Sequence, residues 1–101
     1  MARYAAIDTH SGYFWGTADA QTPALAAAKI DHDTSGAERE VEMVERRPSH
    51  QLNGRDGYRL YAIPDGVSLD GEDGQDQAVI ERIEAWGCVA VVECIPLQAE
   101  G

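Results

Sequence analysis

The chain has 101 residues, 44% of them hydrophobic, which suffices for one domain spanning residues 1–101 and leaves no room for a second core. It carries 18 acidic and 8 basic residues, a formal net charge of −10, so direct binding to nucleic acid or to an acidic lipid surface is disfavoured. No apolar run approaches the ~20 residues of a membrane-spanning helix, and Asp8 interrupts the N-terminus too early for a signal peptide, so we expect a cytoplasmic protein.

The first third of the chain predicts a hairpin followed by a helix. Arg3–Thr9 and Gly12–Ala18 are rich in apolar and aromatic residues and are joined by a short turn, as in two antiparallel strands. Thr22 then precedes Pro23, which is a hydroxyl cap followed by proline at the first helical position. A helix should therefore begin at Pro23 and run to about His32.

Two further strands are expected in the middle of the chain. Glu38–Arg46 mixes charged and apolar residues, and such a charged strand is typical of a sheet edge. A long loop with Asn-Gly and Asp-Gly turn signals follows. Tyr58–Ile63 is the next strand, and Pro64 ends it.

The segment Gln75–Pro96 is the one around which the rest should pack. Its first half has the apolar spacing of an amphipathic helix, which Gly87 should end in a left-handed conformation. Its second half, Cys88–Ile95, is almost entirely apolar, so both faces should be buried and the strand should lie inside a sheet. The predicted core residues of this segment are Val79, Ile83, Trp86, Val89, Val91 and Val92.

The resulting order is β-β-α-β-β-α-β. It predicts an α+β fold: a two-layer sandwich in which a mostly antiparallel five-stranded sheet carries two helices on one face. Cys88 and Cys94 lie six residues apart on one strand, about 20 Å, which is too far for a disulfide. We expect both to be reduced and to lie on the same face of that strand.

Residues that could carry chemistry are present without an assembled motif. Asp8, His10, His32 and His50 are metal-ligand types, but their spacing matches no ligand motif. No serine lies in a nucleophile elbow, and no glycine-rich phosphate loop with a lysine is present. We therefore expect a non-enzymatic protein with no catalytic residues, no metal and no cofactor. A small enzyme or metal-dependent domain that uses Asp8, His10, His32 and His50 is the alternative.

Two features suggest a protein partner. Carboxylates accumulate between residues 65 and 84, and the aromatic residues exceed what a small core can hold. A solvated surface is the plain interpretation of such a charge run, and a site for a basic protein surface is the functional one. The predicted partner-binding residues are Asp65, Asp70, Glu72, Asp73, Asp76, Glu81, Glu84, Tyr13, Trp15 and Tyr61.

The function favoured by these features is a small protein-binding module. It would be an inhibitor or regulator that occupies the basic surface of a nucleic-acid-binding partner, as charge-mimic inhibitors of phages and mobile elements do. That analogy rests on charge and size alone. A structural homodimer is a further alternative, formed through an aromatic face of the sheet made of Tyr13, Trp15, Tyr58 and Tyr61.

Overall fold

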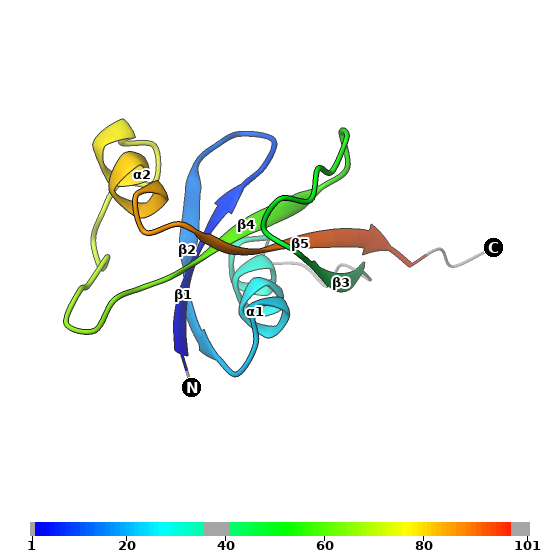
Figure 1. Cartoon of the computed structure of the whole chain (residues 1–101), viewed down its shortest axis with the longest axis horizontal. Coiled ribbons are helices and arrows are strands. Elements are labelled where there is room, and N and C mark those ends of the chain that lie inside the picture. The colour runs from blue at the N-terminus through cyan, green and yellow to red at the C-terminus, as the bar shows by residue number, and fades with distance from the viewer. Residues whose placement is uncertain (1, 36–40, 98–101) are drawn as a thin grey trace.

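The computed structural model describes residues 2–35 and 41–97, which form a five-stranded sheet and two helices (Figure 1). The predicted α+β class and element order are confirmed. The predicted Glu38–Glu40 part of the third strand lies outside the described residues. The elements are β1 (Ala2–Asp8), β2 (Phe14–Ala20), α1 (Pro23–Ser35), β3 (Val41–Arg46), β4 (Gly57–Ala62), α2 (Gln77–Glu84) and β5 (Cys88–Pro96).

The sheet has the strand order β2-β1-β4-β5-β3, and every neighbouring pair is antiparallel. The apolar strand β5 lies between β4 and β3, as its sequence predicts. The charged strand β3 forms one edge, also as predicted, and β2 forms the other edge. Neither helix of the described residues is long and apolar enough to cross a membrane.

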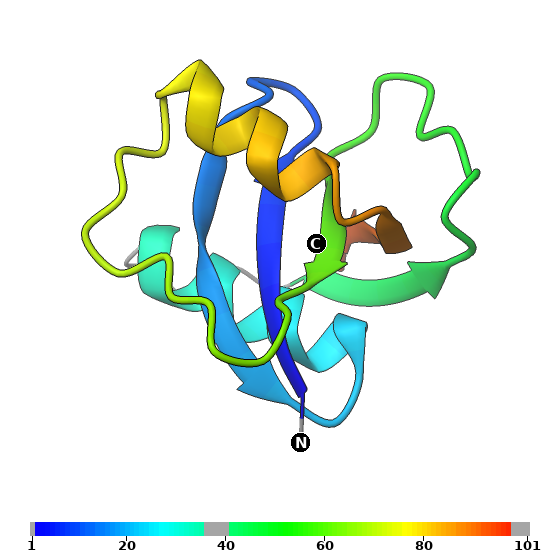
Figure 2. The same ribbon diagram turned by 60° about the vertical axis from the view of Figure 1, so that its left-hand side comes forward.

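The two helices pack on opposite faces of the sheet, so the expectation of both helices on one face is wrong (Figure 2). Tyr4 and Ala6 of β1 lie in the core cluster that includes Ile30 of α1. Ala5 and Ile7, which alternate with them, lie in the cluster that includes the apolar residues of α2. Successive side chains of a strand point to opposite faces of the sheet, so an uninterrupted apolar run such as Tyr4–Ile7 indicates that both faces are covered by other elements.

The helix boundaries follow from the caps that the sequence predicts. Thr22 Oγ1 accepts a hydrogen bond from the N–H of Leu25 at 3.2 Å, at the start of α1. Asp76 is the N-cap of α2, and its Oδ1 accepts from the N–H of Ala78 at 2.9 Å. Gly87, with φ +89°, turns the chain from the end of α2 into β5.

A register shift at the start of β5 overturns two predictions. Leu60 pairs with Ala90 and Tyr61 pairs with Cys88, so Val89 has no partner on β4 and is 41% exposed. Val89 is therefore not a core residue. Trp86, which was also predicted to be a core residue, packs against the α2 cluster but is only partly buried. The extra residue also turns Cys88 to the α2 face, whereas Cys94 packs on the α1 face. Both cysteines are free, but they do not share a face.

Candidate functional site

The acidic loop between β4 and α2 is fastened to the edge strand β2. The N–H of Phe14 donates to the carbonyl oxygen of Gly74 at 2.9 Å. A Cβ atom at Gly74 would collide with the carbonyl oxygen of Phe14, so only glycine permits this approach. The loop is thereby held along β2 instead of projecting from the molecule.

The residue that anchors the acidic loop, Phe14, lies between two exposed aromatic residues in the chain. Tyr13 and Trp15 flank Phe14 in the chain and are 42% and 37% exposed, whereas Phe14 is buried in the α2 cluster. The Trp15 ring packs edge-to-face on Tyr58, with ring centroids 5.7 Å apart. Tyr58 belongs to the α1 cluster, so Trp15 lies on the α1 face of the sheet, oriented by a buried neighbour while part of its indole faces solvent.

The carboxylates of the loop and of α2 are all exposed. Asp73 and Asp76 shape the loop, since Asp73 Oδ1 accepts from the N–H of Gln75 at 2.9 Å and Asp76 caps α2. Arg82 of α2 contacts Glu72 at 3.0 Å, which ties the helix to the loop. We use the name acidic surface for this set together with the two aromatic side chains: Asp70, Glu72, Asp73, Asp76, Glu81, Tyr13 and Trp15.

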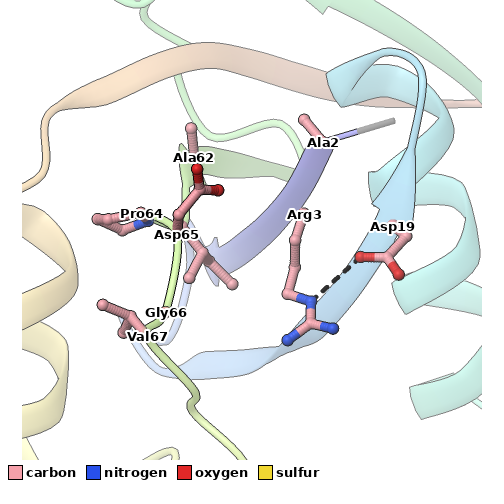
Figure 3. Close-up of a pocket in the computed structure, with 9 residues that line it drawn as sticks. Ala2, Arg3, Asp19, Ala62, Pro64, Asp65, Gly66 and Val67 are labelled. Atoms are coloured by element: carbon pink, nitrogen blue, oxygen red, sulfur yellow. Dashed lines mark hydrogen bonds and ion pairs between the residues drawn. The ribbon is translucent and has the colours of Figure 1, made fainter.

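Asp65 lies apart from the acidic surface. It lines a pocket of about 530 Å³ with Arg3 and Asp19, which form an ion pair at 3.1 Å (Figure 3). This pocket is at the Ala2 end of β1, whereas Ile7 near the other end packs against α2. Since β1 spans about 20 Å, Asp65 does not contribute to the same surface.

Two tyrosines that were expected to form exposed aromatic surface are buried instead. Tyr61, a predicted partner-binding residue, is 2% exposed and accepts a hydrogen bond from Arg59 Nε at 3.0 Å. Tyr58 is 3% exposed and packs on the α1 face, while Tyr61 packs on the α2 face. The aromatic sheet face proposed for a homodimer therefore does not form, and Tyr13 and Trp15 are what remains of it at the surface.

The residues of the metal or enzyme alternative are only partly gathered. Asp8, His10 and His50 line one cleft, which also contains Glu84 from the end of α2. His32 is exposed on α1 and lines a different pocket, formed by α1 and β2. Among the described residues, no three or more metal-ligating side chains are close enough together to hold a metal ion.

Sequence reasoning missed a buried charge cluster around Glu93. This residue of β5 is 2% exposed and accepts hydrogen bonds from Arg55 at 2.8 Å and from Arg46 at 3.1 Å. His50 Nε2 lies 3.8 Å from the same carboxylate. The bond from Arg55, with that from Arg46, holds the pKa of Glu93 below its usual range, against the opposing effect of burial. The available signal was a single glutamate inside an otherwise apolar strand.

Comparison with protein-family models, curated proteins and solved structures gives no match for this chain. Its function is therefore argued from the surfaces and clefts of the structure itself.

Proposed function

We propose that the protein is a small, non-enzymatic binding module that occupies the basic surface of a protein partner. The observation that carries the proposal is the Phe14–Gly74 contact, which fastens the segment 70–76, with its four carboxylates, to the residue that Tyr13 and Trp15 flank in the chain. Aromatic side chains are the usual anchors of protein interfaces, since they bury a large area at low entropic cost. Neighbouring carboxylates attract a partner of opposite charge and orient its approach.

The partner is proposed to be a nucleic-acid-binding protein, with this chain acting as its inhibitor or regulator. Arginine and lysine clusters that bind phosphates also bind carboxylates, because both are oxyanions that accept charge-assisted hydrogen bonds. The loop from Asp70 to Asp76 carries four acidic residues and no basic residue, and the formal net charge of the whole chain is −10. Such a surface would compete with nucleic acid for the same basic groups. Direct nucleic-acid binding is not part of the proposal.

A cytoplasmic location belongs to the same proposal. Cys88 and Cys94 are both free thiols and lie on opposite faces of the sheet, which suits a reducing compartment.

Capture from a lysate of the native host, followed by competition, tests the function. The immobilised chain should retain a nucleic-acid-binding protein that is eluted by raised salt and by added nucleic acid. The matched variants are Asp70→Asn/Asp73→Asn on the acidic surface and Glu42→Gln/Glu45→Gln on β3, at the opposite edge of the sheet. Each pair changes the net charge by the same amount, from −10 to −8. Retention should be lost with the first pair and kept with the second. Equal retention by both variants contradicts the proposal.

A further inference from the structure

A cleft of about 400 Å³ opens on the α2 face of the sheet, apart from the acidic surface. One wall is the loop between β3 and β4, and the other is formed by the hairpin turn after β1 and by Glu84 at the end of α2. Ile7, Arg59 and Val91 come from three neighbouring strands and form the floor. The volume is in the range of sites that enclose small organic ligands.

The loop wall is fixed in place without a ligand. Arg55 and His50 are drawn to the buried carboxylate of Glu93, at 2.8 Å and 3.8 Å. Leu52 packs so closely over Gly57 that a Cβ atom there would collide with it. At the end of the loop, the carbonyl oxygen of Asp56 accepts a hydrogen bond from the N–H of Cys94 at 3.0 Å. A preformed cleft loses little conformational entropy when a ligand binds.

Arg59 supplies the cleft with an incompletely paired cation. Its side chain is half-buried, and its Nε donates to the hydroxyl of buried Tyr61 at 3.0 Å. Across residues 2–35 and 41–97 no carboxylate forms an ion pair with Arg59, so both terminal nitrogens are left for a ligand. The bond to Tyr61 raises the pKa of Arg59 despite partial burial, and the nearby charge of Glu84 adds to that effect.

The remaining lining defines the chemistry of the ligand. Ile7 and Val91 are 3% and 1% exposed and close the floor, while the half-buried Leu52 on the loop wall offers the accessible apolar surface. Arg55 is already neutralised by Glu93, while Asp8 and Glu84 add negative charge to the walls. A ligand with one negative charge is therefore favoured over a doubly charged phosphate, because among the described residues Arg59 is the one arginine of the cleft without a direct ion pair and the wall carboxylates repel further negative charge.

We propose that this cleft binds a small organic carboxylate. Its carboxylate is held by the two terminal nitrogens of Arg59, in the bidentate geometry that guanidinium favours, and its apolar body lies against Leu52, above the floor of Ile7 and Val91. The site is independent of the acidic surface and of the proposed protein partner.

Titration of the ¹⁵N-labelled chain with benzoate, at constant ionic strength, tests the proposal by NMR. Saturable shifts should appear at the amides around Ile7, Leu52, Arg59 and Val91, with a dissociation constant of about 1–10 mM. Benzamide, which has the same ring without the charge, should bind at least about tenfold more weakly. Phenyl phosphate should bind no better than benzoate. A benzamide affinity equal to that of benzoate, or phenyl phosphate binding more than about tenfold tighter, overturns the assignment.

Two variants with opposite expected effects complete the experiment. Arg59→Gln should weaken benzoate binding at least about tenfold, because the bidentate ion pair is lost. Glu84→Gln should strengthen it about two- to threefold, because a competing charge on the wall is removed. Absence of saturable shifts in the wild type, unchanged affinity in Arg59→Gln, or weaker binding in Glu84→Gln refutes the site.

Discussion

Glu93 accepts a 2.8 Å hydrogen bond from Arg55, which joins the most apolar strand of the sheet to the long loop between β3 and β4. The carboxylate is 2% exposed, and Arg46 of the edge strand contacts it from another side. A buried carboxylate persists only where such partners compensate its desolvation. The pair thus explains both the glutamate in an apolar strand and the fixed position of the loop.

The lowered pKa of Glu93 predicts a pH-dependent contribution to stability. A carboxyl whose pKa is lower in the folded state stabilises the fold above its unfolded pKa, about 4.3, and that contribution is lost as pH falls through the folded pKa. Urea unfolding at pH 7, 5 and 3 checks this. Glu93→Gln should lower the midpoint clearly at pH 7 and 5, and the gap to the wild type should narrow at pH 3. Glu42→Gln on β3 is the exposed control, and a gap for Glu93→Gln that is independent of pH would contradict the account.

The register shift in β5 predicts unequal costs for two apolar truncations. Ile83→Ala should lower the free energy of unfolding by about 2–5 kcal/mol, because Ile83 of α2 is fully buried against the sheet. Val89→Ala should cost less than about 1 kcal/mol, because Val89 is unpaired on β4 and 41% exposed. Chemical denaturation of both variants measures the difference. A cost for Val89→Ala as large as that for Ile83→Ala would place Val89 in the core and refute the register.

The close approach of Gly74 to Phe14 predicts that a single methyl group detaches the acidic loop. Gly74→Ala should destabilise the fold by about 1–3 kcal/mol and shift the amide signals of Phe14 and Trp15. Gly71→Ala is the control in the same loop. It is also disfavoured, since Gly71 has φ +78°, but it should leave the β2 signals unchanged. If Gly74→Ala leaves the signals of Phe14 and Trp15 in place, the loop is not anchored there.

Trp15 is expected to govern how long the partner stays bound. Trp15→Ala removes a partly exposed indole that Tyr58 holds in position, so the dissociation rate of the captured partner should rise at least about tenfold. Leu25→Ala, a truncation of a more exposed apolar residue on α1, should change the dissociation rate less than about twofold. Surface-based kinetics with both variants measures these rates. Equal dissociation rates would remove Trp15 from the interface.

The sequence predicts most of the fold because its local signals agree with one another. The cap at Thr22, the charged edge strand β3 and the interior position of β5 all appear as expected. The placement of the helices on opposite faces was missed, although the apolar residues on both faces of β1 and β5 carried that information.

The candidate site was predicted less completely, because it depends on contacts between distant segments. Burial of Tyr61 and the Glu93–Arg55 pair require the strand order, which no local pattern specifies. The same holds for the contact of Phe14 with Gly74. It fixes the segment 70–76 beside β2, whereas Asp65, earlier in the same loop, lines a separate pocket. Carboxylate positions along the chain could be read directly, but which of them share a surface could not.

The association rate of the captured partner is the most direct test of the acidic surface. Asp70→Asn/Asp73→Asn should slow association at least about fivefold at low salt, and this difference should shrink as salt screens the exposed charges. Glu42→Gln/Glu45→Gln leaves the chain at the same net charge, −8 after removal of two charges from −10, and should slow association less than about twofold. Equal association rates for the two variants at every salt concentration would show that net charge alone acts, and would contradict the claim that this surface binds the partner.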